Sequence, residues 1–475
     1  MQAGAVLVTG ALVAGCGAGY RPVISPINPS GPAPQPTSLV AVVSTPSPSS
    51  PGVATIIDYA GDTIVARSPI GPDPTSFTID QTGSTGYTVN SDGTLTNFPV
   101  SSQLQQKNVE YTTLPTTSKL VNLFSPSAGL WAGDLTGDVV DVLTGFPETF
   151  KLSIPVAPTP MMIVGPAQVG QRNYVISQGF TDTTGVACNV APQSAGALGE
   201  ADAIEAETNT VSARIPLGKC PVYGVQSADG RRLFVLNRGD DTITVINSQN
   251  NTLDACTPFL NQAGQLVTCH PSLPLSTAAG LNGPNAPAIA GPVYAEYNSI
   301  TNQIVVADYD GGTISVIDVS LDVYGNDGPT FGTTFTIPVG TNPASVTALN
   351  DGSRAYTANQ ADGTVSVVDL SSHTLTKTLP VNGHPRTVVS TQNSLYGKVY
   401  VASPDSPYLT ILRTDQDIVD TTVLVQGNIV DVRTSTQDAS RGNANVVSRK
   451  PGFGQPCNLP PNIQAPAAAT CSKMP

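Results

Sequence analysis

Charged residues are scarce in this chain, and basic residues are the scarcer kind. Only 12% of the 475 residues are charged, and 21 Lys and Arg stand against 34 Asp and Glu, which gives a net charge of −13. No basic cluster is denser than the pairs Arg231-Arg232 and Arg449-Lys450. Proteins that bind DNA or RNA carry a basic patch against the phosphates. We therefore expect no nucleic-acid partner.

The local signatures of catalysis and metal binding are also missing. The chain has no Gly-x-Ser-x-Gly elbow, no His-Glu-x-x-His motif and no phosphate-binding loop. It has no Cys-x-x-Cys pair, and Cys269-His270 lacks the preceding cysteine of a haem attachment motif. We expect no metal and no cofactor, although a Ser/His/Asp triad assembled from distant segments stays open.

Sustained helical periodicity is absent, whereas 44 Gly and 42 Pro supply many turns. The chain instead repeats a short strand motif, clearest in Gly363–Asp369, which alternates β-branched residues between a Gly and an Asp. The eight copies begin at residues 52, 93, 137, 199, 241, 312, 363 and 407. Most are 41 to 44 residues apart, which is typical of a repeat architecture with loop insertions.

Each period holds four strands, as the last clear unit shows with Pro343–Ala348, Ala355–Asn359, Gly363–Asp369 and Thr376–Val381. One antiparallel sheet cannot bury both faces alone, but sheets stacked radially around an axis bury both. The sequence therefore predicts an all-β fold, a single β-propeller of eight four-stranded blades. Seven blades is the alternative, if the degenerate unit near Gly93 or Gly199 forms no sheet.

The two ends of the repeat region are incomplete in complementary ways. Strands at Leu39–Ser44, Gly52–Tyr59 and Thr63–Pro69 lack a first strand, and Asn428–Arg433 is a first strand on its own. Together they predict one composite blade that closes the ring and removes its open edge.

The repeat resembles the YVTN-type β-propeller family. The resemblance rests on an Asp-Gly turn, an aromatic-containing strand that ends in Asn, and a Gly-Thr-Val strand that ends in Asp. It is best in Asn342–Gly383, with Asp351-Gly352, and in Asp229-Gly230 with Leu233–Asn237, and it covers roughly residues 38–434. It implies a propeller but not a function, because propellers carry many unrelated sites.

The first 37 residues predict export. Residues 1–15 are apolar and too short to span a membrane, as in a secretory signal peptide, and Leu12–Cys16 resembles a bacterial lipobox. We expect a lipidated Cys16, a proline-rich tether over residues 16–37, the propeller over 38–434 and an irregular proline-rich tail over 435–475. The expected location is the bacterial cell envelope, periplasmic or on the outer surface. The alternative for residues 1–15 is a buried apolar strand.

Six cysteines remain after Cys16, and all lie outside the repeated strands. In an exported chain an even number predicts disulfides, although six cysteines allow 15 pairings. Sequence proximity favours Cys256–Cys269 and Cys457–Cys471. Cys188 and Cys220 then remain as the third pair. Cys188 is expected in a loop between a second and a third strand and Cys220 in a loop between blades, and in a propeller both kinds of loop emerge on the same face.

Candidate site residues follow the second strand of each unit, where they ring one face of the disc. They are Asn90, Asp134, Gln178, Arg238, Asp308, Asn359 and Ser403. They either line a funnel or form turns that the repeat needs. His384 lies at a blade junction on the same predicted face. We select Asp134, Arg238, Asp308, Asn359 and His384 as candidate ligand-binding residues.

We expect a monomeric, non-enzymatic propeller, tethered to the membrane, that binds or scaffolds a protein, peptide or glycan. Its site is expected on the face that carries the Cys188 insertion, the Cys220 junction and the loop 276–291, because loops longer than a fold requires often carry function. The alternative is a lactonase-like or other propeller hydrolase with a metal at the axial opening, held by residues such as Asp134, Asp308, Asn359 and His384.

Overall fold

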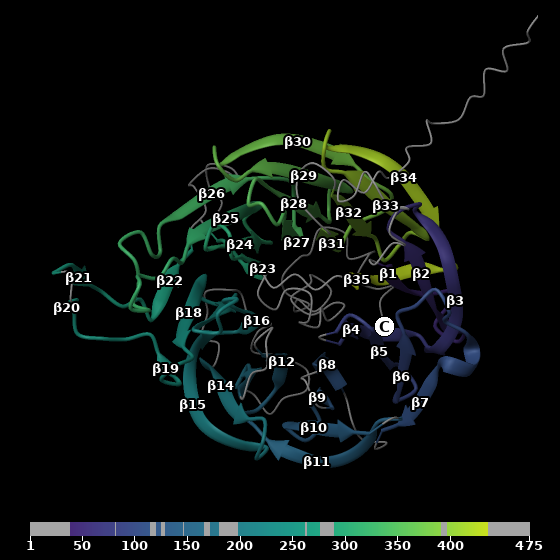
Figure 1. Ribbon diagram of the computed structural model, residues 1–475, viewed down its shortest axis with the longest axis horizontal. Helices are drawn as coiled ribbons and strands as arrows, with labels where there is room; N and C mark the ends of the chain where they lie inside the picture. The colour runs from purple at the N-terminus through teal and green to yellow at the C-terminus, as the bar shows by residue number, and fades with distance from the viewer. Residues whose placement is uncertain are drawn as a thin grey trace, which may run out of the picture.

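Eight sheets stand around a central axis in the computed structural model, which describes residues 39–80, 82–114, 120–124, 129–145, 147–165, 172–179, 198–261, 264–275, 289–390 and 397–435 (Figure 1). The only helical element of these residues is a 3-10 turn, η1, at Gln106–Asn108. No helix in this part of the chain is long and apolar enough to cross a membrane. The all-β, eight-bladed prediction is confirmed, and the seven-bladed alternative is wrong.

The strands of the first four blades run from the axis outward as follows. Blade 1 holds β35 (Asn428–Thr434), β1 (Leu39–Thr45), β2 (Pro51–Asp58) and β3 (Thr63–Pro72); blade 2 holds β4 (Pro74–Ile79), β5 (Thr85–Asn90), β6 (Thr94–Pro99) and β7 (Glu110–Thr113); blade 3 holds β8 (Leu120–Phe124), β9 (Leu130–Asp134), β10 (Val139–Thr144) and β11 (Thr149–Pro155); blade 4 holds β12 (Pro160–Val164), β13 (Arg172–Ser177), β14 (Leu198–Glu205) and β15 (Thr210–Lys219).

The last four blades continue in the same order. Blade 5 holds β16 (Pro221–Gln226), β17 (Arg232–Asn237), β18 (Thr242–Asn247), and an outer strand divided into β19 (Thr252–Leu253) and β22 (Ser272–Pro274); blade 6 holds β23 (Pro292–Asn298), β24 (Gln303–Asp308), β25 (Thr313–Asp318) and β26 (Thr334–Pro338); blade 7 holds β27 (Pro343–Ala348), β28 (Arg354–Asn359), β29 (Thr364–Asp369) and β30 (Thr374–Pro380); blade 8 holds β31 (Thr387–Ser390), β32 (Lys398–Ala402), β33 (Tyr408–Arg413) and β34 (Ile418–Leu424).

The repeated motif forms the third strand of every blade, and both of its faces are buried. In β29, Val365 and Val367 pack in a cluster with residues of blade 8, whereas Val368 joins a cluster that extends through blades 4 to 7. All three side chains are fully buried. The unusual run of apolar residues on both sides of the strand therefore follows from the radial stacking of the blades.

The ring closes through blade 1, as predicted. β35 pairs antiparallel with β1, with Val432 opposite Val42. Beyond the strand, the backbone N–H of Ser435 donates to the carbonyl oxygen of Leu39 at 2.8 Å. Ile429 and Val432 are fully buried, so the last strand of the described chain forms part of the core.

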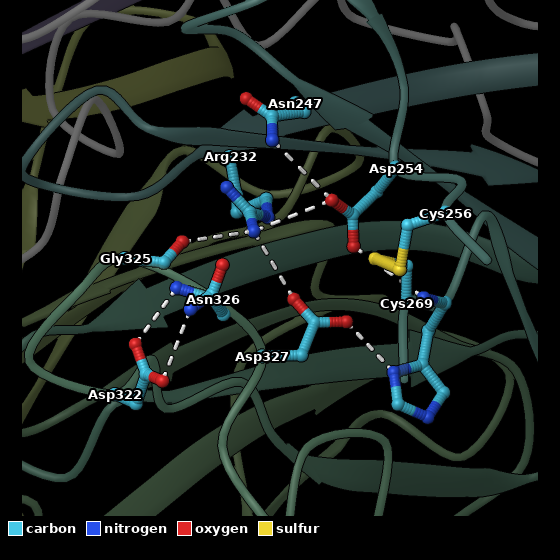
Figure 2. Close-up of a disulfide and its surroundings, with 10 residues drawn as sticks. Arg232, Asn247, Asp254, Cys256, Cys269, Asp322, Gly325, Asn326 and Asp327 are labelled. Carbon is cyan, nitrogen blue, oxygen red and sulfur yellow. Dashed lines mark hydrogen bonds and ion pairs between the residues drawn. A yellow bond between two sulfur atoms is a disulfide. The ribbon is translucent and has the colours of Figure 1, made fainter. Parts of the chain in front are cut away.

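Blade 5 departs from the simple repeat. Its fourth strand is divided, and a two-stranded hairpin, β20 (Phe259–Leu260) and β21 (Leu266–Val267), lies between the two halves. A disulfide between Cys256 and Cys269 closes this insertion, which confirms that predicted pair (Figure 2).

Several predictions fall outside the described residues. The signal peptide and tether (residues 1–37), the tail after Ser435, and Cys16, Cys188, Cys457 and Cys471 lie there. Cys220 is described and is disulfide-bonded, but the predicted partner Cys188 is not among the described residues.

Candidate binding site on the junction face

One face of the disc, here called the junction face, carries the loops between second and third strands and the loops between blades. Its described loops include residues 91–93, 135–138, 238–241, 309–312, 360–363 and 403–407 within blades, and 156–159, 339–342 and 381–386 between blades. The five candidate residues all lie in these loops or at the strand ends beside them. They belong to blades 3, 5, 6 and 7 and to the junction of blades 7 and 8.

The residue that ends the second strand contacts the third strand of the same blade. In blade 7, Nδ2 of Asn359 donates to Thr364 Oγ1 at 3.0 Å and to Ser366 Oγ at 2.8 Å. Equivalent pairs of hydrogen bonds join Asn90 to Thr94 and Thr96, and Asn237 to Thr242 and Thr244. The Asn and the Thr-x-Ser/Thr of the repeat are thus one structural unit.

A glycine from the preceding blade covers this asparagine. A Cβ atom on Gly340 would come within 2.5 Å of Asn359 Cγ, so only glycine allows this approach. Asn359 is fully buried as a result. Its visible role is to join the second and third strands of blade 7, beneath the loop that leads in from blade 6.

Blade 6 has an aspartate where the other clear units have asparagine. Asp308 Oδ2 accepts hydrogen bonds from Ser315 Oγ at 2.6 Å and from Thr313 Oγ1 at 3.2 Å. The side chain is fully buried, and burial is the main cause that raises the pKa of Asp308 to about 7. The nearby carboxylates of Asp241 and Asp310 raise it further, against the two hydrogen bonds.

Replacing Asp308 by Asn is expected to stabilise the protein above pH 7. The folded-state pKa of Asp308 lies above its ordinary value of 3.8, so wild-type stability decreases as the pH rises from about 4 through about 7. Each pKa unit corresponds to about 1.4 kcal/mol, so D308N should gain about 2 to 4 kcal/mol over wild type at pH 8 and little at pH 4. Urea unfolding at the two pH values measures this difference.

Asp369→Asn provides the opposite case. Hydrogen bonds from Ser371 and Ser372 lower the pKa of Asp369 to about 2, so its carboxylate stabilises the fold above pH 4 and loses that effect near pH 2. D369N should therefore lose stability at pH 8. A D308N variant that is less stable than wild type at pH 8 would contradict our account of the buried carboxyl.

Arg238 joins blades 5 and 6 through a bidentate ion pair. Its Nη2 lies 2.8 Å from Asp310 Oδ1 and its Nε 3.1 Å from Asp310 Oδ2, while the guanidinium stands over the Tyr309 ring, 5.3 Å from its centre. The side chain is almost completely buried. Beside it, burial and then Asp310 raise the pKa of Asp241 to about 6, against a hydrogen bond from the backbone of Gly291.

The structure thus places Arg238 against Asp310, two residues after Asp308, and leaves the other candidates apart. Asp134 is buried in blade 3, where its Oδ1 accepts from the backbone N–H of Thr136 at 2.8 Å. The side chains of Asp134, Arg238, Asp308 and Asn359 are all closed off from solvent. In this structure Arg238 Nη2, Asp308 Oδ2 and Asn359 Nδ2 make their contacts with other residues of the protein.

His384 is the candidate with an exposed side chain, and Asp405 orients it. His384 Nδ1 lies 2.5 Å from Asp405 Oδ2, and the backbone N–H of His384 donates to Oδ1 at 2.8 Å. The His384 side chain is 42% exposed. Burial opposes ionisation of Asp405, but the hydrogen bonds from His384 keep its pKa below the ordinary value.

Sequence reasoning did not select Asp405, Asp310 or Tyr309. Asp405 lies two residues after Ser403, in the same loop between a second and a third strand. That position in the repeat is the signal by which the sequence could have identified it. Among the described residues, no three His, Cys, Asp or Glu side chains converge as a metal-binding group.

Comparison with known proteins identifies the fold but not the family. No family model and no curated protein matches the sequence. The structure is similar to apo AztD from Citrobacter koseri, with a TM-score of 0.56 and 12% identity over 84% of this chain and 97% of that one. It is also similar to the dihydro-heme d1 dehydrogenase NirN in complex with DHE, with a TM-score of 0.56 and 14% identity over 86% and 77% of the two chains. At such identities the likeness shows the fold alone.

Proposed function

We propose that this chain is an exported, membrane-tethered propeller that binds or scaffolds a protein, peptide or glycan, with a contact at His384 on the junction face. One observation carries the site: of the five candidates, His384 alone offers an exposed polar group, and the fold fixes its direction through Asp405. Gly383 makes this possible, because a Cβ there would come within 2.5 Å of Asp405 Oδ1.

The geometry suits recognition of hydroxyl or amide groups. When Nδ1–H donates to Asp405, Nε2 is left as an acceptor, and the carboxylate selects that tautomer. Asp405 holds both the ring, through Nδ1, and the backbone N–H of His384, so the side chain loses little freedom on binding, which favours affinity. Hydroxyls of a glycan and N–H groups of a peptide both meet this acceptor.

Binding to peptide and glycan arrays tests the proposal. We expect ligands that wild type retains to bind H384Q at least tenfold more weakly, and D405N several-fold more weakly, with little change in melting temperature. His373→Gln is the control, because His373 lies in the turn between β29 and β30 on the opposite face, stacked on Phe335 with ring centres 3.7 Å apart. Equal binding by H384Q and wild type, or a loss only in H373Q, rejects this site.

The hydrolase alternative is less well supported by the arrangement. It requires Asp134, Asp308, Asn359 and His384 to converge on the axial opening, whereas each of them is engaged by residues of its own blade or of the junction beside it. Tightly bound stoichiometric metal in the purified protein would favour the hydrolase instead.

The proposed location rests on the N-terminal sequence and on the cysteines. The Cys256–Cys269 disulfide supports an oxidising compartment, because such bonds persist mainly in exported proteins. Mass analysis of the mature N-terminus from the membrane fraction tests the anchor: a lipidated Cys16 supports it, and an unmodified or unprocessed N-terminus rejects it.

A further inference from the structure

The insertion in blade 5 exposes apolar side chains at the rim of the disc. The hairpin of β20 and β21 projects outward from the ring at the left of Figure 1. Phe259, Leu260 and Leu266 on this hairpin are between 42% and 68% exposed. The propeller does not need this hairpin, since the other blades build their outer strand without one.

A loop of the neighbouring blade extends the same surface. Residues 319–333 join β25 to β26, and within them Val323 is 91% and Tyr324 50% exposed. Asn261 Nδ2 donates to Asp322 Oδ2 at 3.3 Å, which sets Leu260 and Val323 on either side of one hydrogen bond. We call the five side chains Phe259, Leu260, Leu266, Val323 and Tyr324 the rim platform.

Both segments of the platform are fixed to one buried arginine (Figure 2). Arg232 Nη2 lies 3.3 Å from Asp254 Oδ1, at the start of the insertion, and 3.2 Å from Asp327 Oδ1, on the loop of blade 6. His270, at the end of the insertion, contacts Asp327 Oδ2 at 2.7 Å. With the disulfide, these contacts hold the platform in place before any partner binds.

The surroundings of the platform select the charge of its partner. The two segments that carry the platform, residues 254–275 and 319–333, contain no Lys or Arg and three carboxylates, Asp254, Asp322 and Asp327. Asp254 and Asp327 are buried against Arg232, so Asp322 is the carboxylate at the surface beside the platform. Arg231 lies near Gly325 on the same loop, and the chain as a whole has a net charge of −13. Each strand of the β20–β21 sheet also keeps one edge without a strand partner in the described part of the chain, and such an edge accepts an extended segment. An anionic lipid surface would be repelled by this charge.

We propose that the rim platform binds an extended, cationic and apolar peptide segment of a partner protein. Apolar side chains of the segment contact the five platform residues, and its Lys or Arg residues face the acidic surroundings. This surface lies at the rim and is independent of His384.

Fluorescence anisotropy with labelled octapeptides tests the platform. We expect a peptide of alternating Lys and Leu to bind the wild-type protein, an alternating Glu–Leu peptide not to bind, and a Lys–Ser peptide to bind at least tenfold more weakly. L260S/L266S should weaken Lys–Leu binding at least tenfold. The control L375S/L424S, with leucines 41% and 54% exposed on β30 and β34, should change it less than twofold.

Two further results decide the proposal. Breaking the disulfide with C256S/C269S should weaken Lys–Leu binding several-fold, because the free hairpin then loses more freedom on binding. Equal binding of the Lys–Leu peptide by L260S/L266S and wild type overturns the proposal. The proposal is also overturned if the wild-type protein binds phosphatidylglycerol vesicles and L260S/L266S does not. That result would assign the platform to a lipid surface.

Discussion

A chain that ends at Gly427 is expected to lose the cooperative unfolding transition of the full propeller. It lacks β35, so blade 1 loses its inner strand and the ring has two open edges. Burying Ile429 and Val432 contributes about 1.5 to 3 kcal/mol each. Further losses come from the pairing with β1 and from the hydrogen bond of Arg433 Nη2 to the Phe77 carbonyl. The net stability of a domain is only about 5 to 15 kcal/mol, so closure is a large part of it.

A chain that ends at Ser435 is the matched control, since it keeps β35 and the bond to Leu39. Thermal unfolding followed by near-ultraviolet circular dichroism compares the two chains. Adding a synthetic peptide of residues 428–435 to the shorter chain should restore the transition. If the shorter chain unfolds cooperatively at the temperature of the control, closure by β35 is not essential.

Replacing Arg232 by Met is expected to destabilise the protein by about 3 to 5 kcal/mol, the usual cost of leaving buried carboxylates without their counter-charge. Arg232, Asp254 and Asp327 are all buried, and one guanidinium nitrogen contacts both carboxylates. Burial is the main cause that raises the pKa of Asp254 to about 6, and Asp327 adds to it against the effect of Arg232. The loss should therefore be smaller at pH 5 than at pH 8.

Arg231→Met measures the effect of losing a charge at the next position. Arg231 is exposed, with Nε 3.6 Å from Asp229, so its removal should cost under about 0.5 kcal/mol. The triple variant R232M/D254N/D327N removes the unpaired charges and should recover most of the loss. Chemical denaturation measures all of these variants, and a single variant R232M as stable as R231M would show that the buried network contributes little.

The sequence predicts the architecture because the fold repeats one energetic solution eight times. Each copy of the strand motif shows apolar residues on both sides, and only stacked sheets bury both. The composite blade follows from counting strands at the two ends. The hairpin of blade 5 could not be predicted, because its strands are only two residues long and its position depends on contacts of Arg232 with Asp254 and Asp327, which are distant in the sequence.

The site was less predictable, because a polar residue at a strand end looks the same whether it faces solvent or the next blade. Asn359 and Asp308 were identified by position, and their hydroxyl partners lie only five and seven residues further along the chain. The sequence does not show that these contacts leave the side chains buried, nor that Gly340 covers Asn359. Asp405 acquires its role only when two separate loops meet.

Closure by β35 also has a consequence for how the protein is made. Strands β1, β2 and β3 of blade 1 are synthesised early, whereas the inner strand of the same blade, β35, comes about 360 residues later. At about 5 to 20 residues per second, those strands wait roughly 20 to 70 s for their partner. Until β35 is present the chain is therefore an open arc with an unpaired β1 edge, which is open to pairing with other chains.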